Sequence, residues 1–341
     1  METKRIEYID ALRGFSMYLV VYTHIWTFSY HHADSTRSFD HILVNFFLVL
    51  FFFVSGFVAY RKEHVLNMNN IGKNLKKKSV QLLIPPIVFS LLLFGIVYRQ
   101  PAKIQHIALA EYWFTIQLFF FFVFYYFTVR FCRKMEGAKL NVVILTIGFL
   151  IYMLSFSHVV IEKTQIGTYL FHYLGMKYWR FYLFFCIGIA IHNSFEQFKK
   201  LTDNPHWMAL FIIGFFFMVF FADRIDFPMW KPINMILYGT LSIIVIFTFF
   251  RKYEHSFESE TKLGYTLQYI GRRTLDVYMI HYFFLPKNLD FLATYLVKYN
   301  NPTLEFFITT IIALLVILVS LIIGNIIRMS PTLSRYLLGT K

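Results

Sequence analysis

Charged residues are scarce in this chain of 341 residues. Asp, Glu, Lys and Arg make up 15% of it, whereas hydrophobic residues make up 57%. A water-soluble domain of this size does not bury so much apolar surface, so the composition predicts an all-α, polytopic membrane protein. The net charge of +14 would suggest nucleic acid in a soluble protein. Here a positive bias on one side of a membrane and contact with anionic lipids account for it, so no nucleic-acid partner is expected.

Cysteine is almost absent, and several motifs of soluble enzymes are missing. The two cysteines, Cys132 and Cys186, have no pairing or metal-ligand spacing, and the histidines within residues 31–41 have none either. No disulfide framework and no metal are therefore expected. The chain also has neither a glycine-rich phosphate loop nor a G-x-S-x-G elbow. The longest stretch between apolar runs, residues 61–79, is too short for a soluble domain, which predicts one transmembrane domain over residues 1–341.

Long apolar runs take the place of these features. The sequence predicts about ten spans, at residues 10–31, 40–60, 80–98, 113–131, 140–161, 178–194, 207–222, 233–250, 266–286 and 304–328. An even number of spans leaves both termini on one side. The loops of that side hold 22 of the 33 lysines and arginines, and the opposite loops hold 9. Because basic residues favour the cytoplasmic side, both termini are expected in the cytoplasm.

Two ionisable residues, Arg13 and His24, lie in the first apolar run. At about 100° per helical residue, their separation of eleven residues equals three turns and about 20°, so both side chains share one face, about 16 Å apart along the axis. Ionisable groups inside a membrane usually mark a functional site. The pair suits an elongated ligand that is anionic at one end and reactive at the other, with Asp10 one turn earlier to hold Arg13.

His24 has the chemistry of a general base. A neutral imidazole can accept the proton of a hydroxyl that attacks a carbonyl, and its ordinary pKa lies near neutral pH. The alternative is a histidine that only forms hydrogen bonds between helices. Arg13 on the same face favours the functional interpretation.

The ninth run carries a polar stripe of Thr274, Tyr278 and His281, at spacings of four and seven residues from Thr274. These spacings put the three side chains on one helical face. Tyr278 and His281 are therefore candidates to stabilise an oxyanion. Arg272 and Asp276, four residues apart, are expected to pair. A hydrogen-bonding seam between helices explains Thr274 and Asp276 equally well.

Further candidates precede or lie in other runs. Lys76, Lys77 and Lys78 could bind a phosphorylated ligand, or could simply orient the chain and contact lipid headgroups. Ser55, next to Gly56, is interpreted as a site of close helix packing before a nucleophile. It stays among the candidates for donor binding.

Several segments together resemble the membrane acyltransferase-3 family of bacterial O-acyltransferases. Arg13 and His24 are similar to its Arg-x10-His signature, and residues 51–57 to its F-F-x-V-S-G-F element. Residues 112–114 and 180–188 resemble its middle spans. Residues 271–281 resemble its G-x-x-S-L-x-I-Y-x-x-H element, with threonine at position 274 where serine is usual. The run before the third span is rich in lysine, where the family is rich in arginine.

The resemblance implies transfer of an acyl group, commonly acetyl from cytoplasmic acetyl-CoA, to a hydroxyl of a cell-envelope carbohydrate or lipid-linked glycan. It also implies ten spans in a bacterial inner membrane, and it gives Arg13 and His24 the role of an essential pair, with Arg180 and Thr274 as supporting residues. A transporter or flippase for a lipid-linked or polymeric glycan remains an alternative, as does a noncatalytic scaffold. The acceptor sugar, the acyl group and the oligomeric state stay open.

Overall fold

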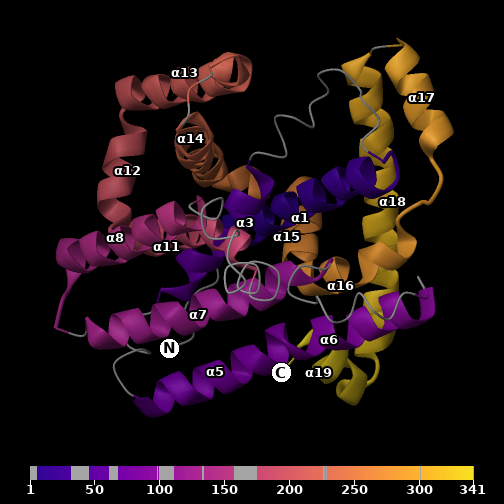
Figure 1. The fold of residues 1–341 in the computed structure, drawn as a ribbon, viewed down its shortest axis with the longest axis horizontal. Coiled ribbons are helices and arrows are strands. Elements are labelled where there is room, and N and C mark those ends of the chain that lie inside the picture. The colour runs from indigo at the N-terminus through magenta and orange to yellow at the C-terminus, as the bar shows by residue number, and fades with distance from the viewer. Residues whose placement is uncertain are drawn as a thin grey trace. The chain divides into compact units, whose positions relative to one another are not determined.

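The structure is a computed structural model that describes residues 6–31, 46–60, 68–97, 99, 111–132, 134–156, 175–225, 227, 229–299 and 301–340. All regular elements in these residues are helices, as the composition predicts (Figure 1). The fold divides into two compact units: residues 1–51 with 209–329, and residues 52–208 with 330–341. One domain over residues 1–341 stays a prediction. Residues 40–45, 98 and 157–161 of three predicted spans lie outside the described part.

The first unit is built around one central helix. Its helices are α1 (Glu7–Phe28), α14 (Trp230–Lys252), α15 (Lys262–Arg272), α16 (Thr274–Phe284), α17 (Asp290–Tyr299), α18 (Pro302–Arg328), most of α13 (Pro205–Phe221), and the short 3-10 helices η4 (Ala222–Arg224) and η5 (Glu254–Phe257). Helix α1 contacts α14, α15, α16 and α18. Most of its side chains are buried, including polar Asp10, Ser16 and Thr23. A helix enclosed in this way can present polar groups to its neighbours without exposing them to lipid.

Two glycines bring α1 and α15 into backbone contact. A Cβ atom added to Gly14 would lie 1.9 Å from the carbonyl oxygen of Leu267, and one added to Gly271 would lie 1.8 Å from that of Asp10. Only glycine fits at such a crossing, which is the small-residue packing common between membrane helices. The crossing fixes the start of α16, because α16 begins three residues after Gly271.

The predicted ninth span, residues 266–286, is wrong as a single helix. Helix α15 ends at Arg272 and α16 begins at Thr274, with Arg273 between them at φ −116° and ψ 20°. The regular rotation of about 100° per residue therefore stops at Arg273. The expected pair of Arg272 with Asp276 depended on that rotation, and Asp276 instead contacts Arg273 and Arg328.

Helix α18 runs antiparallel to α1 and α16. Near its start, Thr310 lies 2.8 Å from the hydroxyl of Tyr18 in the middle of α1. Near its end, Gly324 packs so closely against α16 that an added Cβ would meet the Cβ of Asp276 at 3.2 Å. Helix α18 thus spans the length of the α1 and α16 pair.

The second unit contains the other helices. They are the end of α3 (Phe47–Ala59), α5 (Met68–Leu82), α6 (Ile84–Ser90), a π-helix η1 (Leu91–Val97), α7 (Trp113–Phe131), α8 (Gly137–Phe156), a 3-10 helix η3 (Met176–Phe181), α11 (Tyr182–Asn193), α12 (Phe195–Asp203) and α19 (Pro331–Leu338). Helices α3 and α11 cross at Gly56 and Gly188, where added Cβ atoms would lie 2.0 Å and 2.1 Å from backbone oxygens. The prediction of close helix packing at Gly56 is confirmed.

A polar network joins the ends of α3, α8 and α11 in this unit. Asn193 donates to the side-chain oxygen of Asn141 at 2.7 Å and accepts from the hydroxyl of Tyr60 at 2.6 Å. Asn141 in turn donates to the Ser194 hydroxyl at 2.6 Å. Asn193 also donates to the carbonyl oxygen of Gly137 at 3.1 Å, and Asn141 to that of Ala190 at 3.3 Å. The network thus satisfies polar side chains and the end of a helix among apolar neighbours.

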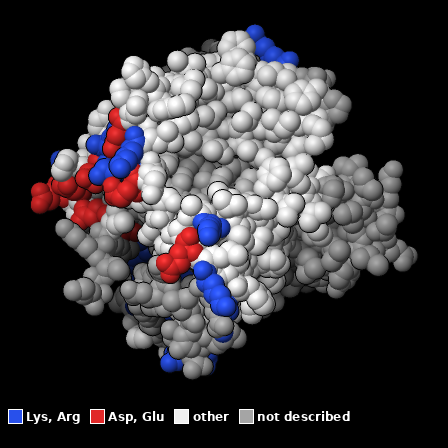
Figure 2. All heavy atoms as spheres, turned by 90° about the vertical axis from the view of Figure 1, so that its left-hand side faces the viewer, with Lys and Arg blue, Asp and Glu red and all other residues white. Residues whose placement is uncertain are grey.

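Five of the described helical segments are long and apolar enough to cross a membrane, or six if α12 and α13 form one bent span. Helix α1 carries three charged residues, and α3, α11 and α16 are shorter than 18 residues. The protein is thus a multi-pass membrane protein by length and composition, whereas the count of ten stays a prediction. Many large apolar side chains are exposed, as Phe131 at 85% and Ile213 at 66% show. Uncharged residues also cover most of the described surface on the face in Figure 2. Lipid contact explains such exposure.

Candidate active site

Two polar contacts join α1 to α16 in the first unit. Arg13 donates from Nη2 to the hydroxyl of Thr274 at 3.3 Å, and His24 Nδ1 lies 2.8 Å from His281 Nε2. The earlier residue on α1 contacts the earlier residue on α16, so the two helices run parallel. Arg13 and His24 therefore do share one face of α1, as their spacing predicts. The long arginine side chain bridges the difference between eleven residues on α1 and seven on α16.

Arg13 lies where a second ligand can reach it. Its ion pair with Asp10 is long, with 3.6 Å between Nη1 and Oδ1, and 34% of its side chain is exposed. Asp10 itself is buried, at 5% exposure. Because a buried carboxylate holds a partly exposed guanidinium from one side, the cation is oriented while its outer surface stays accessible.

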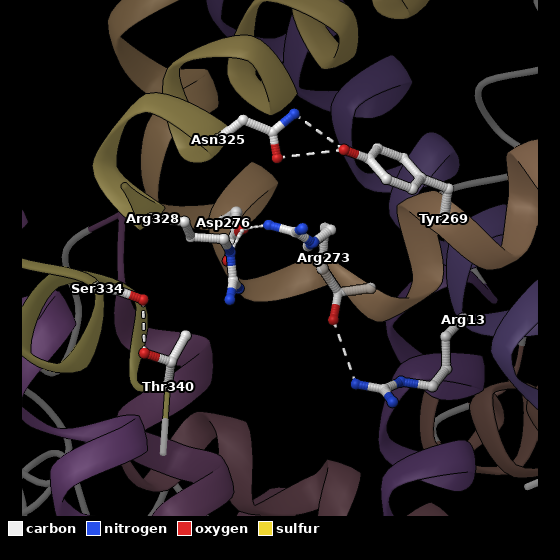
Figure 3. Close-up of polar contacts among 9 residues, drawn as sticks. Arg13, Tyr269, Arg273, Asp276, Asn325, Arg328, Ser334 and Thr340 are labelled. Atoms are coloured by element: carbon white, nitrogen blue, oxygen red, sulfur yellow. Dashed lines mark hydrogen bonds and ion pairs between the residues drawn. The ribbon is translucent and has the colours of Figure 1, made fainter. Parts of the chain in front are cut away.

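A second group of charges surrounds the start of α16 (Figure 3). Arg328 donates to both carboxylate oxygens of Asp276, from Nε and from Nη2, each at 2.7 Å. Arg273 adds a contact of 3.4 Å to the same carboxylate, which is 1% exposed. Together with the pair of Arg13 and Asp10, these contacts involve three arginines and two aspartates. The excess cation makes the region suited to an anionic ligand.

No sequence pattern predicted Arg328 as the partner of Asp276. It lies 52 residues from Asp276, beyond the reach of the three- and four-residue spacing rules that predict pairs within one helix. The close approach that joins the two depends on Gly324, which lets α18 pack against the side chain of Asp276. A glycine one turn before a terminal arginine in an apolar helix was the available hint, and it is a weak one.

The other end of the pair is aromatic and largely dry. The ring of His24 is half-buried and lies 5.5 Å from Phe28 and 5.1 Å from Tyr282, measured between ring centroids. His281 is fully buried, and its Nδ1 lies 3.0 Å from the carbonyl oxygen of Val277 and 2.9 Å from that of Tyr278. His24, held between these aromatic rings and His281, can exchange a proton with a ligand where water is largely excluded.

Tyr278 completes the predicted stripe on α16. Its side chain is buried at 8% exposure, and its ring lies 6.0 Å from that of His281. Thr274, Tyr278 and His281 therefore lie along one helix, with Thr274 and His281 both directed at α1. A role in stabilising an oxyanion stays a prediction for this stripe.

The remaining candidates lie in the second unit. Lys76 and Lys77 are exposed on α5, whereas the ammonium of Lys78 lies 4.0 Å from the centre of the Phe122 ring. Ser55 is half-buried on α3. Arg180 lies over the rings of Phe156 and Phe181, at 5.9 Å and 5.3 Å. These contacts give Lys78 and Arg180 a packing role, and donor binding by the set stays a prediction.

A comparison with known protein families identifies the chain. The family model Acyl_transf_3, described as an acyltransferase domain, matches residues 6–323. The chain belongs to the acyltransferase-3 family. The match runs from the start of α1 almost to the end of α18, so it includes Arg13, His24 and all of α16. No curated protein and no solved structure gave a significant match. The protein is thus an acyltransferase with several membrane-crossing helices. In the part of the chain that the structure describes, no three His, Cys, Asp or Glu side chains gather as metal ligands.

Proposed function

We propose that this protein is an integral O-acyltransferase of the bacterial inner membrane. It moves an acyl group, acetyl in the simplest case, from cytoplasmic acyl-CoA to a hydroxyl of a cell-envelope carbohydrate. The observation that supports this most is the pair of contacts that direct Arg13 and His24 of α1 at α16. A cation at one end and an imidazole at the other match a donor whose phosphates and thioester are far apart.

In this mechanism Arg13 binds the phosphates of the donor. Its partly exposed guanidinium and the excess positive charge around the start of α16 favour an anion there. Lys76, Lys77 and Lys78 and the hydroxyl of Ser55 are further candidates for donor binding. The thioester then lies deeper, beside His24.

His24 acts as the general base. It takes the proton of the acceptor hydroxyl while the hydroxyl oxygen forms a bond to the thioester carbonyl carbon. The bond from carbon to sulfur then breaks, and the CoA thiolate takes up the proton that His24 holds. Tyr278 is the candidate to donate to the developing oxyanion. Direct transfer is favoured over an acyl-enzyme because no serine or cysteine lies beside a base among the candidate residues.

The proposed topology has ten spans and both termini in the cytoplasm. The parallel course of α1 and α16 supports it, because two parallel helices must be separated by an even number of crossings, counted from the start of one to the start of the other. The predicted first span and α16, the second half of the predicted ninth span, satisfy this condition. The bias of lysine and arginine puts the starts of both helices, and therefore Arg13, on the cytoplasmic side.

The acceptor is proposed to be a carbohydrate or a lipid-linked glycan. In the second unit, Trp113 and Tyr178 stack face to face, with 3.6 Å between centroids and 7° between planes. Stacked aromatic rings of this kind offer a flat apolar face to a sugar ring. Interfacial tryptophan and tyrosine also anchor proteins in membranes, so this support is weaker than that for the donor.

The second candidate function is a transporter or flippase for a glycan. The direct contact between His24 and His281 favours it, since two adjacent histidines in a membrane could relay protons. Such a protein would carry its substrate across the membrane without cleaving a thioester.

Purified protein in lipid nanodiscs distinguishes the two functions. It is mixed with radiolabelled acetyl-CoA and a mixture of lipid-linked and free glycans, and both free thiol and labelled glycan are measured. The enzyme releases CoA in step with labelled glycan, and His24→Ala abolishes both while it still binds lipid and melts as the wild type does. Absence of acceptor-dependent release, with glycan movement across proteoliposomes, would overturn the proposal in favour of the transporter.

A further inference from the structure

The two histidines of the site meet edge to edge in one plane. Their ring planes differ by 15°, and the ring centroids lie 5.0 Å apart, whereas His24 Nδ1 and His281 Nε2 lie 2.8 Å apart. The difference between these two distances is close to two ring radii. Both nitrogens therefore lie near the line that joins the ring centres. This is the geometry of a linear hydrogen bond between the rings, and it excludes face-to-face stacking.

The other nitrogen of His281 decides which atom carries the hydrogen. His281 Nδ1 faces two backbone carbonyl oxygens, those of Val277 and Tyr278, at 3.0 Å and 2.9 Å. A carbonyl oxygen only accepts hydrogen bonds, so Nδ1 of His281 must be the donor. In a neutral imidazole the second nitrogen is then an acceptor. His281 is fully buried, and a buried charge is costly unless a charged partner accompanies it, so the ring is neutral.

The hydrogen between the rings must therefore belong to His24. With Nε2 of His281 as acceptor, Nδ1 of His24 donates, and a neutral His24 keeps an unprotonated Nε2. Among the residues that the structure describes, this Nε2 has no hydrogen-bond partner, and the ring that carries it is half-buried. The lone pair needed for general-base catalysis is thus left on the one nitrogen that can meet a substrate.

We propose that His281 is a positioning residue that fixes the Nδ1–H tautomer of His24 and so makes Nε2 the catalytic base. The proposal rests on the proposed function of His24. It changes the role expected for His281 from the sequence, because both nitrogens of His281 are engaged and neither is left to donate to an oxyanion. Tyr278 then remains as the candidate on α16 for that task.

The pair also holds the charge that develops during transfer. When the acceptor hydroxyl gives its proton to Nε2 of His24, the ring becomes an imidazolium, and its Nδ1–H bond to His281 becomes a charge-assisted bond. The carbonyl oxygens of Val277 and Tyr278 accept from Nδ1 of His281. Their dipoles polarise the His281 ring and strengthen its Nε2 as the acceptor for the imidazolium of His24. When the carbon to sulfur bond breaks, the thiolate takes the proton from Nε2, and the neutral tautomer returns without rotation of either ring.

Substitutions of His281 test this assignment. Glutamine keeps a hydrogen-bond acceptor at the ε position, whereas leucine fills the space and removes it. His281→Leu is expected to lower kcat about tenfold with little change in the KM for acyl-CoA, less than the roughly 100- to 10,000-fold that a general base contributes, because the base itself is kept. His281→Gln is expected to recover a large part of that loss. Thermal melting shows whether each variant folds.

Nitrogen-15 NMR of protein labelled at histidine tests the tautomer directly. In the wild type, the signal that disappears in His24→Gln is expected to show a protonated Nδ1 and an unprotonated Nε2. In His281→Leu the same signal is expected to shift toward the Nε2–H form. The proposal would be overturned if the wild-type signal assigned to His24 by its loss in His24→Gln showed the hydrogen on Nε2, and this result does not require His281→Leu to fold.

Failure of this inference differs from failure of the proposed function. If His281→Leu turned over at the wild-type rate while His24→Ala were inactive, His24 would still be the base and His281 would not position it. If His24→Ala kept full activity, the proposed function of His24 would fall, and with it the role of His281.

Discussion

The crossing of α1 and α15 allows a sharp prediction, because Gly14 and Gly271 face backbone atoms. An alanine Cβ at Gly14 would lie 1.9 Å from a carbonyl oxygen, and one at Gly271 would lie 1.8 Å from another. Real Cβ atoms essentially never come within 3.0 Å of such an atom, so the helices must separate by at least about 1 Å. Each substitution should cost about 3 kcal/mol, the upper part of the range for overpacking, because backbone cannot rotate away as a side chain can.

Activity should fall more steeply than stability. The bond from Arg13 to Thr274 is already 3.3 Å long, so a further 1 Å breaks it. A displacement of that size at a catalytic constellation costs about 100-fold in rate. The assay is acceptor-dependent CoA release by Gly14→Ala and Gly271→Ala in nanodiscs, with the melting temperature measured on the same samples.

Gly72→Ala is the matched control. Gly72 lies in a helix, α5, and a Cβ there would meet nothing within 4 Å. This variant should be as active as the wild type and up to about 1 kcal/mol more stable, since alanine favours a helix over glycine. If both Gly14→Ala and Gly271→Ala had the activity and the melting temperature of the wild type, the crossing of α1 and α15 would not be what positions α16 against α1.

Three further predictions follow from other contacts. Arg328→Ala should destabilise the protein by about 3 kcal/mol, because it removes the bidentate partner of buried Asp276, and Asp276→Asn in the same chain should restore part of the melting temperature. Asn193→Ala loses three side-chain bonds, of 2.6 Å, 2.7 Å and 3.1 Å, and should cost about 2 kcal/mol in chemical denaturation. The pKa of Glu7, in the first turn of α1 and outside the predicted span, is lowered chiefly by a hydrogen bond from the Ser259 backbone amide. Because the folded state favours the ionised carboxylate, Glu7 contributes to the stability of the fold above the usual glutamate pKa of 4.5, and this contribution is lost as pH falls through the lower folded pKa. Glu7→Gln should therefore show a smaller loss of melting temperature on acidification than the wild type.

Local periodicity predicted the parts of the site that lie on single helices. The face shared by Arg13 and His24 follows from rotation along α1, and the stripe from Thr274 to His281 follows from rotation along α16. The bounds of α7, Trp113–Phe131, equal those of the predicted fourth span. In these places the apolar pattern and the helix geometry act over the same short range, and no distant contact alters them.

Contacts between residues that are far apart in the chain could not be predicted from the sequence. The break at Arg273 and the pairing of Asp276 with Arg328 depend on how α1, α15 and α18 pack, which periodicity within one run does not show. The same holds for the contact between His24 and His281, which are 257 residues apart. Each histidine was a candidate by itself, but their mutual hydrogen bond, and hence the tautomer argument, required the fold.

The binding of CoA tests the account most directly, because it separates the two ends of the proposed site. The dissociation constant of CoA is measured by calorimetry for the wild type, Arg13→Ala and His24→Ala in the same nanodiscs. The account predicts that Arg13→Ala weakens binding at least about tenfold, the effect of losing one charged hydrogen bond to a phosphate, while His24→Ala binds as the wild type does and transfers nothing. The account would be contradicted if Arg13→Ala bound CoA with wild-type affinity, or if His24→Ala lost CoA binding while Arg13→Ala kept it.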